Sequence, residues 1–225
     1  MEPPYGSSPN DETRSLSLGA IVEQGELFNV ASHAVGFVLA AVGTLFLVVP
    51  PIERGEVFKA VVLSGYGAGL VAVFLASVLF HAAQGRPRQV LRRLDRSAIY
   101  ICIGATYSPV VTVLLPLSWS LPVLGVVWAL AVYGVALEWI GSREAERHSV
   151  NLYRLLGWLS LPLLAPLAPQ VGWAGVTLLV VGGILYSVGS VAVRLRSVRM
   201  THELWHVLVL IATGLHYVFM LVYVA

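Results

Sequence analysis

The chain has 225 residues, of which 57% are hydrophobic and only 12% charged, and its mean hydropathy is +0.81. Soluble domains carry about 25% charged residues, so this composition excludes an ordinary soluble domain, whose surface must face water. The net charge of +2 is too small to indicate a nucleic acid as partner.

The first segment of the chain, residues 1–22, contains Pro, Ser and Asn together with acidic side chains and has no long apolar run. Such a segment buries too little apolar surface to fold by itself. We therefore expect a disordered or loosely attached tail. Residues 23–225 are predicted to form one transmembrane domain.

Long apolar runs with short polar connections make up the rest of the sequence. A helix needs about 20 apolar residues to cross the hydrocarbon core of a bilayer, whereas an open sheet would leave unpaired backbone groups in lipid. We therefore predict an all-α membrane protein, a bundle of seven transmembrane helices with antiparallel neighbours. The runs cover residues 26–50, 57–82, 97–116, 120–140, 151–168, 171–193 and 203–225.

The basic residues are distributed unequally between the two sides of this bundle. All but two of the 14 lysines and arginines lie in the tail or near the loops after the second, fourth and sixth helices, which share one side. Cytoplasmic loops carry the excess of basic residues, so the N-terminus is predicted to be cytoplasmic and the C-terminus external. The acidic tail, followed by Arg54 and Lys59, favours the reverse, but the five arginines of residues 86–96 outweigh it.

Ionisable residues inside a membrane are costly, so each is a functional candidate. His202 and His206 are four residues apart, which places them on one face of a helix, and two such imidazoles can bind one zinc ion. His81 ends the second helix on the same cytoplasmic side. Asp95 precedes the third helix there, and Ser77 lies one turn deeper than His81. The pattern predicts a metal site at this level of the membrane.

Two further sets of polar residues have other expected roles. Glu26, Asn29 and His33 share a face of the first helix and begin at the cytoplasmic side. The spacing leaves the roles of Glu26 and Asn29 open, and we expect a structural or supporting role for His33. His216 lies about 21 Å along the helix axis from His202, too far to share a metal, and is expected to hydrogen-bond a neighbouring helix.

Five segments, in order along the chain, are similar to the hemolysin III family, to which the progestin and adipoQ receptors and the alkaline ceramidases look related. The similarity extends from about residue 22 to the end. Two residues depart mildly, because Arg96 stands where histidine is common and Ser108 where threonine is usual. The matching segments are Glu26–His33, Ser77–His81, Leu94–Tyr100, Gly104–Pro109 and His202–Val209.

This resemblance implies a seven-helix fold with a cytoplasmic N-terminus and a zinc ion held by His81, His202 and His206. It places Ser77 and Asp95 beside the metal and its water, and we expect these two residues to be catalytic. The family is linked to hydrolysis of lipid amides and esters, and its bacterial members carry a haemolysin label. We therefore expect a multi-pass protein of the bacterial inner membrane, with membrane lipids as environment and substrate.

Other functions stay open on the sequence. The run from His202 to His206 also fits the H-E-x-x-H pattern of zinc proteases, with Glu203 as general base. That reading needs a third ligand, and Ala212 stands where one family of such enzymes has a histidine; Asp95 is another candidate. A structural zinc in a receptor-like or membrane-stress protein predicts the same three histidines, and a haemolysin-type cytolytic protein is a further class.

Overall fold

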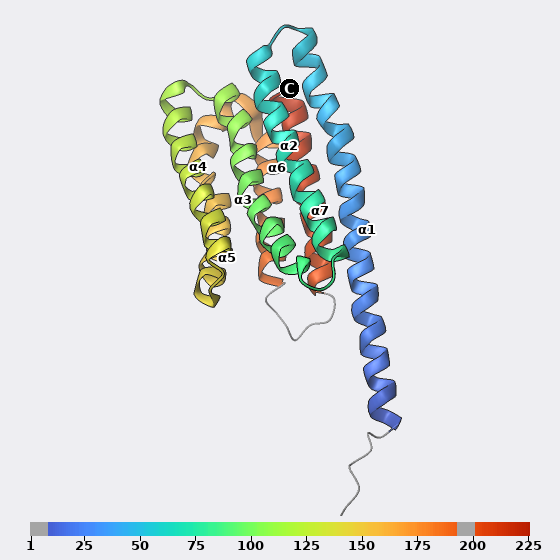
Figure 1. Cartoon of the computed structure of the whole chain (residues 1–225). Helices are drawn as coiled ribbons and strands as arrows, with labels where there is room; N and C mark the ends of the chain where they lie inside the picture. The colour runs from blue at the N-terminus through green and yellow to red at the C-terminus, as the bar shows by residue number, and fades with distance from the viewer. Residues whose placement is uncertain (1–8, 193–200) are drawn as a thin grey trace, which may run out of the picture.

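The computed structural model describes residues 9–192 and 201–225, which are helical except for short connections. The helices run up and down side by side (Figure 1), and those next to one another in the chain pack together; α1 also packs against α7. The expected all-α architecture is confirmed for the described residues. The elements are α1 (Pro9–Glu53), α2 (Val57–Ala82), α3 (Pro87–Leu114), α4 (Leu117–Ile140), α5 (Arg143–Trp158), the 3-10 turn η1 (Leu161–Leu163), α6 (Leu164–Ala192) and α7 (Thr201–Tyr223).

Two helices begin earlier than the apolar runs indicate. α1 begins at Pro9 and is helical through the second half of the segment expected to be a loose tail, because extending an existing helix is far easier than nucleating one. Residues 1–8 of that tail lie outside the described residues. α3 begins at Pro87, ten residues before its apolar run, with proline in its first turn. The polar segment 87–96 contains four arginines, which favour helix.

Six described helical stretches are long and apolar enough to cross a membrane. Five of them span 22 to 29 residues, but the stretch Asn151–Ala192 spans 42. Gly172 interrupts this stretch with a non-helical backbone (φ 61°, ψ −179°), a conformation that only glycine adopts easily. In Figure 1 the segment comprising α5 and α6 begins and ends at the same end of the bundle.

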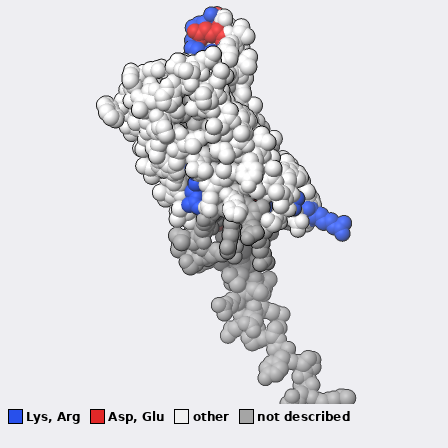
Figure 2. Space-filling view, turned by 90° about the vertical axis from the view of Figure 1, so that its left-hand side faces the viewer, with Lys and Arg blue, Asp and Glu red and all other residues white. Residues whose placement is uncertain are grey.

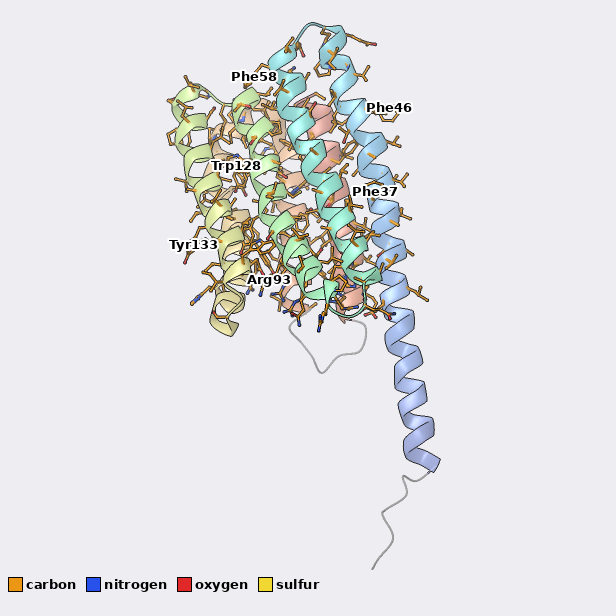
Figure 3. All side chains as sticks on the ribbon, in the orientation of Figure 1. Phe37, Phe46, Phe58, Arg93, Trp128 and Tyr133 are labelled. Carbon is orange, nitrogen blue, oxygen red and sulfur yellow. The ribbon has the colours of Figure 1, made fainter. Side chains whose placement is uncertain are left out.

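The outer surface of the bundle is apolar. Figure 2 shows a broad uncharged band that separates charged residues at the α1–α2 turn from basic side chains near the other end. Large apolar side chains point away from the helices within this band (Figure 3); Phe46, Phe58 and Tyr133 are 63%, 62% and 56% exposed. A continuous apolar surface of this extent is typical of contact with lipid, so the chain is a multi-pass integral membrane protein.

The charged turn between α1 and α2 lies at the far end from the arginine-rich α2–α3 turn (Figure 1). Glu56 pairs there with Arg54 at 3.1 Å and with Lys59 at 3.0 Å, and the hydrogen bond from Arg54 lowers the pKa of the Glu56 carboxyl. Arg54 also donates to the carbonyl oxygen of Ala225 at 2.5 Å. The end of α7 is thereby tied to this turn.

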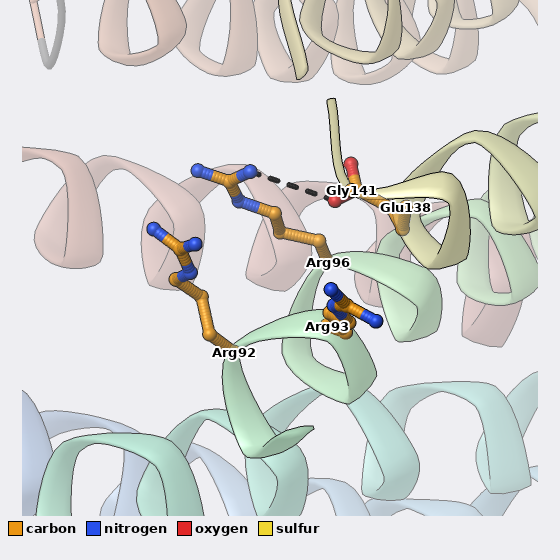
Figure 4. A pocket seen from close by; sticks show the side chains of 5 residues that line it. All are labelled: Arg92, Arg93, Arg96, Glu138 and Gly141. Carbon is orange, nitrogen blue, oxygen red and sulfur yellow. Dashed lines mark hydrogen bonds and ion pairs between the residues drawn. The ribbon is translucent and has the colours of Figure 1, made fainter. Parts of the chain in front are cut away.

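A polar cluster joins α3 to α4 at the arginine-rich end (Figure 4). Arg96 lies 3.5 Å from the carboxylate of Glu138, which is 4% exposed. Arg93 lies over the ring of Trp139, 6.0 Å from its centroid. The cavity lined by these arginines, Arg92, Glu138 and Gly141 has a volume of about 30 Å³, room for a water molecule or two but not for a lipid headgroup. We interpret the cluster as a link between helices.

Candidate metal centre

Three imidazoles meet where α2 ends and α7 begins. His81 is in the last turn of α2, and His202 and His206 occupy the first two turns of α7. His202 Nε2 lies 3.4 Å from His81 Nε2 and 3.2 Å from His206 Nε2. One ring nitrogen from each of the three lies within 4.8 Å of the others. The structure thus brings together all three predicted ligands, which the sequence separates by up to 125 positions.

The spacing of these nitrogens suits one small tetrahedral ion. Zinc binds imidazole nitrogen at about 2.0–2.1 Å, so two nitrogens on one tetrahedral zinc lie about 3.3–3.4 Å apart. The two separations from His202 Nε2, 3.2 and 3.4 Å, match that value, and the third pair lies within 4.8 Å. Imidazole nitrogens also suit zinc far better than calcium or magnesium, which prefer oxygen ligands. The three residues can therefore hold a metal ion, and the donor set fits zinc.

The remaining nitrogens of two of these rings contact polar groups of α1. His81 Nδ1 lies 2.5 Å from Glu26 Oε2, and His206 Nδ1 lies 2.7 Å from His33 Nε2. His81 and His206 are buried, at 6% and 1% exposure, and His33 is buried at 3%. Each Nδ1 is thus engaged on the side away from the cluster, so each Nε2 faces the other imidazoles.

Glu26 has a second partner at the α2–α3 turn. Its other carboxylate oxygen accepts a hydrogen bond from Arg88 in the first turn of α3. Arg88 in turn donates to the carbonyl oxygen of Ala83 at 3.1 Å, and its guanidinium lies 4.9 Å from the centroid of the Phe80 ring. The sequence placed Glu26 on the correct face without assigning it a partner, and it did not single out Arg88. A carboxylate in an apolar run at the level of an arginine-rich loop was the available signal.

Ser77 and Asp95 form a pair between α2 and α3. Ser77 is 3% exposed and lies one turn before His81 on α2. The Ser77 hydroxyl lies near the carboxylate of Asp95. Asp95 does not belong to the group of clustered metal-ligating atoms found among the described residues.

The two other polar residues of α7 that the sequence discussed do not belong to the clustered group of ligating residues. His216 Nε2 lies 3.2 Å from the carbonyl oxygen of Leu179 on α6, which confirms the expected hydrogen bond between helices. The Glu203 carboxylate lies against Gly25 of α1, where an added Cβ atom would come within 2.5 Å of it. Glu203 is in the first turn of α7, where a negative charge is favourable against the helix dipole.

Comparison with known proteins assigns the family. The sequence profile described as "Haemolysin-III related" matches residues 22–217. The chain belongs to the hemolysin III family. It is 30% identical over 202 residues to "Hemolysin-3" of Bacillus cereus, covering 88% of this chain and 91% of that protein.

Further relatives match over most of their length. The chain is 30% identical over 186 residues to "Hemolysin-3 homolog" of Bacillus subtilis, covering 82% of this chain and 87% of that protein. The human "Monocyte to macrophage differentiation factor" is 26% identical over 198 residues, covering 84% of this hemolysin III family member and 80% of the human protein. The predicted resemblance to the hemolysin III family is therefore confirmed.

Proposed function

We propose that this hemolysin III family member is a zinc-dependent hydrolase of lipid amides or esters, acting at the cytoplasmic side of the bacterial inner membrane. The observation that carries the proposal is the cluster of three imidazoles, in which His202 Nε2 lies 3.2 and 3.4 Å from the other two Nε2 atoms, with Ser77 buried one turn before His81. Three protein ligands leave a fourth position of a tetrahedral ion for water or substrate, as in catalytic zinc sites.

The proposal includes seven transmembrane helices with a cytoplasmic N-terminus. The 42-residue stretch Asn151–Ala192 would be about 63 Å long as one helix, twice the thickness of the hydrocarbon core. The backbone break at Gly172 divides it into residues 151–171 and 173–192, and each part has about the 20 residues that a crossing needs, which supports two crossings. The excess of basic residues at the arginine-rich end supports a cytoplasmic location for that end, and the three histidines are at that end.

The protein's own residues would position the reaction around the ion. His81, His202 and His206 would hold it. When bound, zinc polarises a carbonyl oxygen and lowers the pKa of water to about 7. Asp95 is suited to accept a proton from the attacking water. Ser77 orients that carboxylate, or it donates its hydroxyl hydrogen to the oxygen that gains negative charge.

The position of the site favours a lipid as substrate. Leu204, between the two histidines of α7, is 46% exposed on the apolar outer surface, and Leu79, two residues before His81, is also 46% exposed. The helix ends that carry the ligands therefore lie beside lipid, at the membrane level of the site. Ser77 lies deeper in the membrane than His81, on the side from which the acyl chain enters. Membrane lipids are accordingly both the environment and the proposed substrate.

The proposal is tested by the release of fatty acid from purified protein in detergent. A panel of ceramides, acyl amides and phospholipids is assayed with wild type, Asp95→Asn, Ser77→Ala and a chelated control. We expect slow release by wild type and lower rates in both variants with zinc retained, because the two residues stabilise the transition state and do not bind the metal. Glu203→Gln is the matched acidic control and should retain both zinc and activity.

The other outcomes assign other functions. Wild type that never exceeds the chelated control on any substrate indicates a structural zinc in a non-enzymatic membrane regulator. Lysis of erythrocytes without fatty-acid release would support the activity named in the bacterial relatives. If Glu203→Gln loses as much activity as Asp95→Asn while it keeps zinc, the H-E-x-x-H protease is the better interpretation.

A further inference from the structure

We propose that Glu26 and His33 of α1 are positioning residues, which fix the tautomers of His81 and His206 so that both Nε2 atoms face the metal. The inference rests on the metal centre of the proposed function and deepens it. It assigns to α1 a role in metal binding, although α1 contributes none of the three ligands.

A neutral histidine must leave the nitrogen that binds a metal unprotonated, so its proton belongs on the other nitrogen. The protein sets this choice by placing an acceptor at the nitrogen that should keep the proton. For His81 that acceptor is the carboxylate of Glu26, at 2.5 Å from Nδ1. For His206 the partner is Nε2 of His33, at 2.7 Å from Nδ1, and this Nε2 is an acceptor when His33 carries its proton on Nδ1. Both contacts direct a lone pair toward the neighbouring imidazoles.

Glu26 is held in place from a second direction. Arg88 donates to the carboxylate oxygen that His81 does not contact, and Arg88 is itself fixed by the Ala83 carbonyl and the Phe80 ring. A carboxylate with both oxygens engaged keeps one orientation. It therefore accepts the His81 Nδ1 proton from a fixed position and raises the basicity of Nε2.

The contacts of His33 indicate a role directed at His206. Its Nδ1 is buried without a partner in the part of the chain that the structure describes, so the contact with His206 is the hydrogen bond that this side chain makes there. Its ring packs edge-on against Phe74, with centroids 5.2 Å apart. A buried polar group with an unsatisfied atom destabilises the fold. Among the described residues, His33 makes one hydrogen bond in spite of this cost, the one to His206, so we assign it the function of orienting that ligand.

The positions of Glu26 and His33 along α1 match the depths of the two ligands that they contact, His81 and His206. Glu26 and His33 are seven residues apart, which is about two helical turns and returns to the same face. α1 packs against both α2 and α7. One face of α1 therefore contacts the ligand at the end of α2 and the deeper ligand of α7. Displacement of α1 would remove both contacts that fix the tautomers of His81 and His206.

The test measures zinc affinity of the full-length protein in detergent by competition with a chelator. Glu26→Ala and His33→Leu remove the two acceptors, and each should weaken zinc binding about 10–100-fold. Glu26→Gln and His33→Gln keep an oxygen acceptor, so each should bind more tightly than the matching Ala or Leu variant. His216→Gln, which changes an imidazole of α7 outside the cluster, is the control and should stay within about threefold of wild type.

A second measurement separates positioning from general loss of structure. Nitrogen-15 NMR of histidine-labelled, metal-free protein should show His81 and His206 protonated at Nδ1 in wild type. Glu26→Gln should change the signal of His81 and leave that of His206, whereas His33→Gln should do the opposite. These variants keep the volume of the side chain, so they serve where the truncated variants fail to fold.

The outcomes distinguish this inference from the function on which it rests. Wild type that binds zinc, with Glu26→Ala and His33→Leu binding equally tightly, overturns the positioning role and leaves the metal centre intact. Wild type that binds no zinc refutes the metal centre. Truncated variants that bind weakly but keep the wild-type tautomers in the metal-free protein would also contradict the inference.

Discussion

Replacing His81 by alanine should nearly empty the metal centre, whereas replacing His216 should leave it full. Apparent binding free energies of four-ligand structural zinc sites are about 10–16 kcal/mol, so one ligand contributes roughly a quarter, about 2.5–4 kcal/mol. At 1.4 kcal/mol for each factor of ten, His81→Ala should weaken zinc binding about 10²–10³-fold. His202→Ala and His206→Ala should have effects of the same order.

His216→Ala is the matched control because His216 is also an imidazole within the membrane region of α7. It contacts the Leu179 carbonyl oxygen at 3.2 Å and not the three clustered nitrogens. Its loss should cost about 0.5–1.5 kcal/mol of stability, the value of one hydrogen bond, with no change in metal content. The assay is metal analysis by mass spectrometry together with chelator competition. If His216→Ala empties the centre while His81→Ala leaves it full, the ligand assignment is wrong.

Two further predictions concern the fold that carries this centre. A cysteine introduced at Gln84 should resist labelling by a membrane-impermeant maleimide in whole cells, and one at Glu53 should react; the opposite pattern would place the arginine-rich end outside. Gly182→Ala should lower the melting temperature in detergent, because its Cβ would lie 2.5 Å from His216 Nε2 and overpacking costs about 1–3 kcal/mol. Gly183→Ala, which meets open space, should leave the melting temperature unchanged, and equal losses in both variants would refute this account of the α6–α7 contact.

The membrane domain could be predicted from the sequence because its physical cause is local. A run of about 20 apolar residues is long enough to cross the hydrocarbon core, and backbone groups in lipid must be satisfied within the helix. The His202–His206 pair was predictable for the same reason, since the helical repeat places residues four apart on one face. His81 could be placed at the same membrane level because short loops make successive helices run in opposite directions.

The partners of the ligands were decided only by the tertiary structure. The contact between Glu26 and His81 joins residues 55 positions apart, and that between His33 and His206 joins residues 173 apart. Such contacts depend on the rotation of α1 about its axis and on its height beside α2 and α7, which hydropathy does not specify. The helical segment before residue 23 and the extension of α3 to Pro87 were also beyond prediction from apolar runs, because polar residues continue a helix once it has formed.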